Sequence, residues 1–144
     1  MERGRRIAFD YGDVRIGVAV CDPDGIVCTP LSALKAQDEK LPEAIRALLE
    51  EYFPIYIAVG EPRHLSGRES TKMDSVAKFV EFLSSLSDLP IRMVDERLST
   101  VSASAKLRSA GKDSRASKDF IDSAAAAEIL EAALARERIQ DGRP

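Results

Sequence analysis

Two short apolar segments joined by a glycine turn open the chain and set the first part of its fold. Residues 6–11 have the pattern of a strand, Gly12-Asp13 that of a tight two-residue turn, and VRIGVAVC at 14–21 that of a second strand. A further turn leads into a third apolar segment at 26–31. The pattern predicts a three-stranded antiparallel meander.

Helical and strand patterns alternate after this meander, which predicts an α/β fold with a mixed five-stranded sheet and helices on both faces. The chain of 144 residues has no linker-like segment and no internal repeat, so we expect a single domain over 1–144 with a core of about 5–138. The predicted elements are a helix at 41–53, a strand at 55–60, a helix at 72–86, a strand at 91–96, and helices at 99–110 and 118–138.

The composition disfavours several classes of site. His64 is the only histidine, so a Ser/His or Cys/His triad would depend on that residue alone, and no Cys and His spacing resembles a zinc site. Cys21 and Cys28 flank a turn without a wider cysteine framework, and we interpret them as free thiols. The chain shows neither a signal peptide nor an apolar run of membrane-spanning length, so we expect a cytoplasmic protein without a membrane partner.

Acidic side chains occur at three points that this layout brings together. Asp10 lies at the end of the first strand, Asp95 and Glu96 at the end of the fifth, and Asp122 in the first turns of the last helix. Ligands of open α/β sheets gather at the carboxyl ends of parallel strands. Because adjacent strand residues face opposite sides, we expect one of Asp95 and Glu96 to pair with Arg97 at the surface instead.

Carboxylates that lie close together raise each other's pKa and cannot all stay ionised without a cation. Mg²⁺ prefers such hard oxygen ligands together with substrate phosphate oxygens. Two ions about 4 Å apart would clamp an in-line displacement at phosphorus. The residues themselves therefore predict metal-assisted phosphoryl chemistry and do not identify a substrate.

Four sequence motifs follow one another along the chain: FDYGDVRIGVAV at 9–20, VGEP at 59–62, DERLSTVSA at 95–103 and IDSAAAAEIL at 121–130. Together they resemble the YqgF family of small bacterial proteins, and the resemblance covers residues 5–137. This family is described as Holliday-junction-resolvase-like and as pre-16S ribosomal RNA nucleases, and it belongs to the ribonuclease H-like superfamily.

The resemblance implies a ribonuclease H-like fold in which Asp10, Glu96 and Asp122 are the catalytic acids that bind Mg²⁺ or Mn²⁺, with Asp95 as the alternative to Glu96. One residue departs from the family pattern. Glu61 stands where the family usually has a small or apolar residue, and an extra acid there would either add a ligand or repel phosphate.

Basic residues are expected to meet the nucleic-acid backbone beside this site. The resemblance implies that Arg15 and Arg97 lie near it; a structural ion pair is the alternative for Arg15.

The basic segment 106–118 directly precedes the helix of Asp122, which would place its side chains beside the site. The alternative for each of these side chains is a solvated loop. Because no aromatic residue interrupts this basic segment, we expect recognition there by backbone and shape. The cations of the segment are Lys106, Arg108, Lys112, Arg115 and Lys118, and a second loop adds Arg63, His64, Arg68 and Lys72.

Three functions are compatible with these features. The first is a hydrolase of ester bonds, a two-metal nuclease that matures the 5′ end of pre-16S ribosomal RNA or resolves branched DNA as a Holliday-junction resolvase does. The second is nucleotide binding of the actin and sugar-kinase type, which the chain is too short to support with two lobes. The third is a non-catalytic RNA-binding factor for ribosome assembly. Cutting a symmetric junction would favour a homodimer, whereas trimming an RNA end would not require one.

Overall fold

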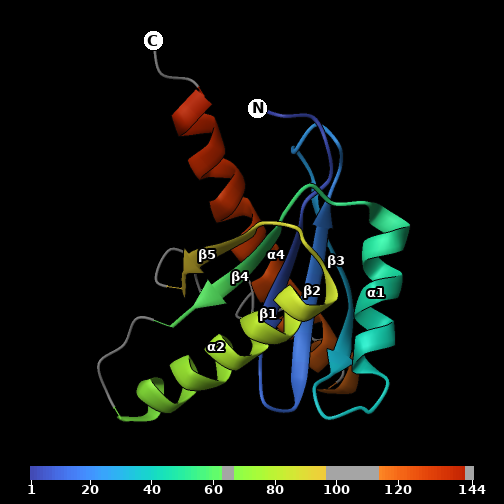
Figure 1. Cartoon of the computed structure of the whole chain (residues 1–144), viewed down its shortest axis with the longest axis vertical. Coiled ribbons are helices and arrows are strands. Elements are labelled where there is room, and N and C mark those ends of the chain that lie inside the picture. Colours follow the sequence, from blue (N-terminus) through green and yellow to red (C-terminus); the bar gives the residue numbers. More distant parts are fainter. Residues whose placement is uncertain (63–66, 97–113, 142–144) are drawn as a thin grey trace.

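The structure is a computed structural model that describes residues 1–62, 67–96 and 114–141, apart from the side chains of residues 67–70 and 114–122. Figure 1 shows how these parts are arranged, with α4 behind the sheet, α2 in front of it and α1 alongside. In chain order the elements are β1 (Ile7–Tyr11), β2 (Arg15–Cys21), β3 (Cys28–Lys35), α1 (Leu41–Tyr52), β4 (Ile57–Glu61), α2 (Gly67–Leu86), β5 (Ile91–Asp95) and α4 (Ser114–Asp141).

The strands form one mixed sheet in the order β3-β2-β1-β4-β5. The first three strands pair antiparallel, while β1 with β4 and β4 with β5 pair in parallel. The predicted α/β fold with a mixed five-stranded sheet and an antiparallel meander is therefore confirmed. Because β1, β4 and β5 run in the same direction, their carboxyl ends meet at one edge of the sheet.

Several boundaries differ from the prediction. The last pair between the first two strands is Tyr11 with Ile16, so four residues connect the paired positions instead of the two expected. Gly12 lets the chain approach itself closely in this longer loop, because a Cβ at this position would lie 2.7 Å from the carbonyl oxygen of Arg15. The third strand covers 28–35 instead of 26–31. Its limits are set by its pairing with β2, which runs from Cys28 to Lys35, and not by the extent of the apolar segment.

Two helices begin earlier than the apolar spacing indicated. α2 starts at Gly67 and α4 at Ser114, within segments that were predicted to be loops. The first residues of both helices are polar, so they add helical turns without the buried periodicity on which the prediction relied. The predicted helix at 99–110 lies outside the described residues.

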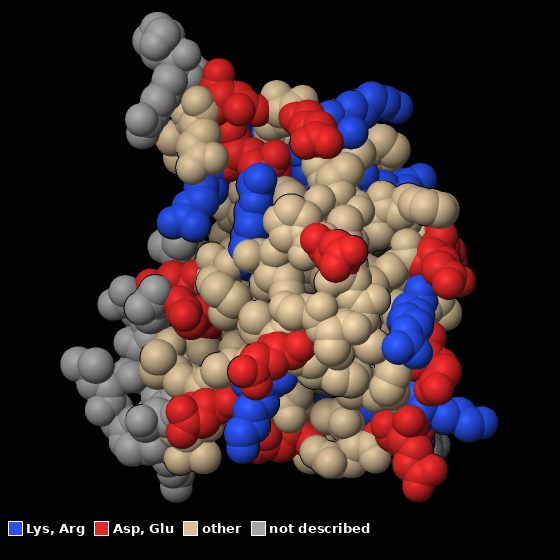
Figure 2. Space-filling view, viewed as in Figure 1, with Lys and Arg blue, Asp and Glu red and all other residues tan. Residues whose placement is uncertain are grey.

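The sheet has an apolar core on each face. Small side chains of the strands, including Ala8 and Ala58, pack against Ala126 and Ala133 of α4, which lets that helix lie close to the sheet. Larger side chains fill the opposite face, where α1 and α2 lie; they include Ile7, Phe9, Ile16, Val18, Ile45, Val59, Phe79 and Leu83. Figure 2 shows this second side, on which charged residues gather mainly towards the periphery of a broad uncharged area.

A buried ion pair joins the sheet to α4 at the amino ends of the parallel strands. The guanidinium of Arg6 donates to both carboxylate oxygens of Glu137, from Nε at 3.1 Å and from Nη2 at 2.9 Å, and Tyr56 Oη donates to the same carboxylate at 2.6 Å. Burial lowers the pKa of Arg6, but the hydrogen bond and charge of Glu137 outweigh it and leave this pKa raised. Burial and the hydrogen bond to Glu137 raise the pKa of Tyr56, so its hydroxyl remains a donor.

The two cysteines lie directly opposite each other on β2 and β3, and both are free thiols, as expected. Burial is the main cause that raises the pKa of both Cys21 and Cys28, the latter to about 12. Among the helices in the described part of the chain, none is long and apolar enough to cross a membrane.

Candidate active site

Asp10 lies near the carboxyl end of β1, an inner strand of the sheet, and is half-buried. Side chains alternate along a strand, and Ala8 packs under α4, so Asp10 projects from the α4 face. It stands opposite Gly17 on β2, and the parallel register with β4, continued by one residue, places Gly60 on its other side. Two residues without side chains therefore flank this carboxylate on the face from which it projects.

Glu96 reaches the same face from β5. Val94 packs in the core under α4, and Glu96 follows it by two residues, just after the strand ends. A Cβ on Gly60 would lie 3.2 Å from both Cγ and Oε1 of Glu96, and 2.7 Å from Cδ1 of Ile129 on α4. The Glu96 side chain thus lies over Gly60, in space that any other residue at that position would fill. The structure brings Asp10 and Glu96 to the same face and edge of the sheet.

Asp95 points to the opposite face. It pairs with Glu61 in the parallel ladder, and Met93, two residues before it, packs on the side of α1 and α2. Alternation therefore separates Asp95 and Glu61 from the face of Asp10. Of the two acids that end the fifth strand, Glu96 is the one that shares a face with Asp10, and the extra acid at position 61 does not join them.

A lysine of α2 approaches this group. Lys72 Nζ lies 3.9 Å from Oε1 of Glu96, and the two side chains are 46% and 20% exposed. At this distance and exposure the pair contributes little to stability. It does place a positive charge at the rim of the site, from a residue of α2.

Helix α4 carries the third predicted acid, Asp122, and the next residue of the helix, Ser123, hydrogen-bonds to the backbone of the sheet. Its fully buried hydroxyl accepts a hydrogen bond from the N–H of Val18 at 3.3 Å and donates one to the carbonyl oxygen of Leu31. Val18 is next to the residue that faces Asp10 across the ladder. The backbone of Asp122 is therefore anchored close to this end of the sheet, while its side chain lies outside the described residues.

The predicted nucleic-acid contacts are described only in part. Arg15 is the half-buried first residue of β2, across from Lys35 of β3. Arg115 and Lys118 lie in the first turns of α4. Because this helix begins before its predicted start at 118, Arg115 belongs to the helix and not to a loop. Six of the predicted basic residues lie outside the described part of the chain: Arg63, His64, Arg97, Lys106, Arg108 and Lys112.

The described carboxylates fit a hard divalent cation. No group of three His, Cys, Asp or Glu side chains placed to hold a metal ion occurs among the described residues, which do not include the side chain of Asp122. Mg²⁺, however, commonly binds one or two carboxylates and completes its shell with water and substrate phosphate. Asp10 and Glu96 supply such a pair on one face of the sheet, so their donor atoms are suited to this ion.

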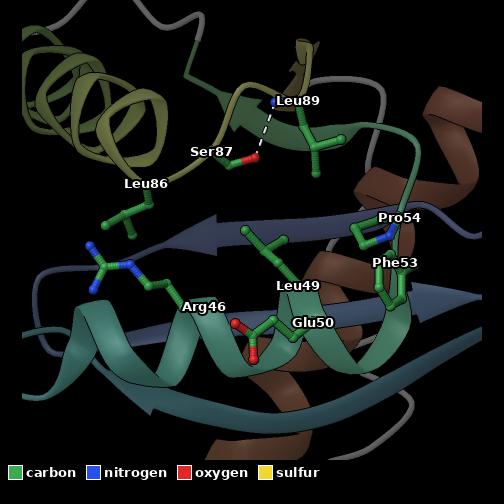
Figure 3. Close-up of a pocket in the computed structure, with 8 residues that line it drawn as sticks. All are labelled: Arg46, Leu49, Glu50, Phe53, Pro54, Leu86, Ser87 and Leu89. Carbon is green, nitrogen blue, oxygen red and sulfur yellow. Dashed lines mark hydrogen bonds between the residues drawn. The ribbon is translucent and has the colours of Figure 1, made fainter.

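A cavity of about 310 Å³ lies at the other end of the molecule, where α1 and α2 end (Figure 3). Its walls include Leu49, Phe53 and Leu89, and Glu50 is its one acid. Phe53 adopts the left-handed conformation that ends α1, with φ 47° and ψ 56°. Because carboxylates do not converge there, this cavity is not the counterpart of the Asp10 and Glu96 site.

Comparison with known proteins agrees with this fold and with the resemblance to the YqgF family. A protein of Streptomyces coelicolor named "Putative pre-16S rRNA nuclease" is 47% identical over 100% of this chain and 87% of its own length. One of the same name from Mycolicibacterium smegmatis is 42% identical over 94% of this chain and 83% of its own. Among solved structures, Thermus thermophilus RuvC in complex with a Holliday junction substrate matches this chain with a TM-score of 0.66 and 13% sequence identity. The match covers 95% of this chain and 96% of that one, so the two share a ribonuclease H-like fold. The RuvX family model, described as Holliday junction resolvase, matches residues 4–136, and the chain therefore belongs to this family of nucleases.

Proposed function

We propose that this protein is a divalent-metal-dependent nuclease in which Asp10, Glu96 and Asp122 hold Mg²⁺ or Mn²⁺ against a phosphodiester. The observation that carries this proposal is the common face of Asp10 and Glu96 at the carboxyl edge of three parallel strands, with Gly60 leaving room between them. That edge is where open α/β sheets place their ligands.

The chain's own groups have separate tasks in this scheme. Asp10 is positioned by an inner strand that pairs on both sides, so its carboxylate keeps a fixed place. Glu96 completes the described pair, and Lys72 brings a positive charge towards the phosphate from α2. Bound metal would activate the attacking water and stabilise the leaving oxygen, in the two-metal manner of many nucleases.

The substrate we favour is the 5′ end of pre-16S ribosomal RNA. This choice is supported by the names of relatives at 42–47% identity, which the chain matches over nearly its whole length. Ribosomal RNA maturation would place the protein in the cytoplasm. Branched DNA is the second candidate, favoured by the description of the family model.

The proposal is tested by cleavage of a labelled precursor of 16S ribosomal RNA and of a four-way DNA junction, each with Mg²⁺, Mn²⁺ or a chelator. We expect metal-dependent cutting by the wild type and none by Asp10→Asn. The matched control is Asp13→Asn, the same change at an exposed aspartate in the adjacent loop, and it should retain activity. If the wild type binds RNA but cuts neither substrate with either metal, and Asp10→Asn binds equally well, a non-catalytic assembly factor is the better description.

The preferred substrate also bears on the oligomeric state. Symmetric cutting of a junction requires two equivalent sites, which a two-fold dimer would supply. Sedimentation of the protein with and without the junction would detect a homodimer, and a monomer that cuts only the RNA would favour the ribosomal role.

A further inference from the structure

A second cavity, of about 250 Å³, lies close to the candidate site but on the other face of the sheet. Tyr11, which directly follows Asp10 at the end of β1, forms part of its wall, together with Phe79 and Phe82 of α2. Alternation along β1 turns Tyr11 towards the face of α1 and α2, where it packs against that core. The cavity and Asp10 therefore lie on opposite sides of one strand end.

Three aromatic rings form a row inside this cavity. The centroids of Tyr11 and Phe79 are 4.9 Å apart with planes tilted by 33°, and those of Phe79 and Phe82 are 6.4 Å apart with a tilt of 35°. Phe79 is 4% exposed and is held from below by Phe9, whose ring meets it nearly edge-on at 5.9 Å. The two outer rings, by contrast, are only half-buried. The result is a packed aromatic surface that remains partly open to solvent.

The charge at this cavity suits a nucleic-acid chain. Lys78, an exposed residue of α2, is its one charged wall residue, and Ser75 adds a hydroxyl. A phosphate backbone that enters over Lys78 would meet a positive charge before its bases reach the rings. The volume is below the roughly 300–1,000 Å³ typical of sites that enclose drug-sized ligands, which favours a single flat ring system over a complete nucleotide.

We propose that this cavity holds one unpaired nucleobase of the substrate, stacked on Tyr11 and Phe82, while the neighbouring backbone passes the strand end that carries Asp10. The inference rests on the proposed nuclease function and assigns to it a subsite for a single-stranded nucleotide. Stacking on aromatic side chains is sequence-tolerant, because every base has a π face. The subsite would therefore select unpaired nucleotides near the cutting position and not a particular base.

The first test is direct binding of a small probe to the full chain. In NMR spectra of protein with ¹³C-labelled Phe and Tyr, uridine 5′-monophosphate should shift the ring signals of Tyr11 and Phe82, whereas ribose 5-phosphate should not. Equal shifts with both probes would mean that only phosphate is bound, and the absence of shifts with either would mean that the cavity binds neither; both results overturn the proposal.

The second test measures the affinity for a fluorescent ten-nucleotide single-stranded RNA in the presence of a chelator, which prevents cutting. Phe82→Leu keeps apolar volume but removes the ring, and we expect affinity to fall at least about 5-fold, the lower limit for loss of one base stack. The matched control is Phe53→Leu, at a phenylalanine that is 81% exposed at the opposite end of the molecule, and it should bind as the wild type does. Thermal melting of both variants shows whether the fold is retained.

These outcomes separate the subsite from the nuclease proposal. If Phe82→Leu binds RNA like the wild type while Asp10→Asn abolishes cutting, the subsite is wrong and the nuclease function stands. If Phe82→Leu weakens binding and the wild type cuts nothing, the base-binding cavity stands and catalysis fails. An abasic oligonucleotide should bind wild type and Phe82→Leu with equal affinity, and a difference between them would contradict stacking.

Discussion

Loss of the Arg6 guanidinium should destabilise the whole fold although it lies at the opposite end of the sheet from the candidate site. Arg6→Met removes the two hydrogen bonds to Glu137, of 3.1 and 2.9 Å, and two more to the carbonyl oxygens of Gly4 and Glu2. It leaves the Glu137 carboxylate, which is 7% exposed, with the hydrogen bond from the Tyr56 hydroxyl. Breaking a buried pair in this way costs about 3–5 kcal/mol. A domain of this size is stable by about 5–15 kcal/mol, so the change removes a large part of the total. The melting temperature should fall by about 6–20 °C.

Urea unfolding followed by circular dichroism measures this free energy. The matched control is Arg92→Met, because the guanidinium of Arg92 lies 4.1 Å from the Tyr56 ring centroid but is exposed to solvent, and its loss should cost no more than about 1 kcal/mol. The double variant Arg6→Met with Glu137→Leu removes both charges, so it should be more stable than the sum of the single losses predicts. A cost below about 1 kcal/mol for Arg6→Met, or strictly additive losses, would refute the reasoning.

Three further predictions concern the site and the thiols. Glu96→Gln should lower the cleavage rate at least about 100-fold, because metal-ion catalysis supplies several kcal/mol. The cleavage rate of Asp95→Asn should stay within about 3-fold of the wild-type rate. A larger loss in Asp95→Asn than in Glu96→Gln would place the metal on the other face of the sheet. In Gly60→Ala the new Cβ would lie 2.7 Å from Ile129 and 3.2 Å from Glu96. We therefore expect the free energy of unfolding, measured in urea, to fall by about 1–3 kcal/mol and cleavage to become about 10- to 100-fold slower. Wild-type activity of this variant would contradict the placement of Glu96 over Gly60. Burial raises the pKa of Cys28 from 9.0 to about 12, so the thiol loses its proton at a lower pH in the unfolded chain than in the folded protein. The free energy of unfolding should therefore fall as the pH rises from 9 to 12. In urea unfolding at alkaline pH, Cys28→Ala should show a shallower fall with pH, and a slope equal to that of the wild type would contradict this prediction.

The sequence predicted which acids form the candidate site, and only the family resemblance favoured Glu96 over Asp95. Local patterns did not show on which face of the sheet each acid lies. The positions of Asp10 and Glu96 at strand ends followed from hydrophobic alternation and from the motifs. The choice between Asp95 and Glu96 depended on which side of the sheet α4 covers, and Val94 and Gly60 decide this through their packing. No local pattern contains that information, because either face of an isolated strand can become the one that a helix covers.

Other features had no usable local signal. Tyr11 and Phe82 are 71 positions apart, and only the packing of α2 on β1 brings them into one cavity. Arg6 and Glu137 come from opposite ends of the chain, and each alone is typical of an exposed residue. The early starts of α2 and α4 were missed because polar first turns carry no apolar period.

The sequence by itself determined the order of the elements, the antiparallel start of the sheet and the acids at its carboxyl edge, because these depend on the alternation of neighbouring residues and on motifs within short segments. The family resemblance had already favoured Glu96 over Asp95, and the tertiary structure places Glu96 on the same face of the sheet as Asp10. Only the tertiary structure decided which glycine makes room for Glu96 and where the aromatic rings meet on the opposite face. These features depend on contacts between segments far apart in the chain. Such contacts form only when α4 packs on one face of the sheet and α1 and α2 pack on the other.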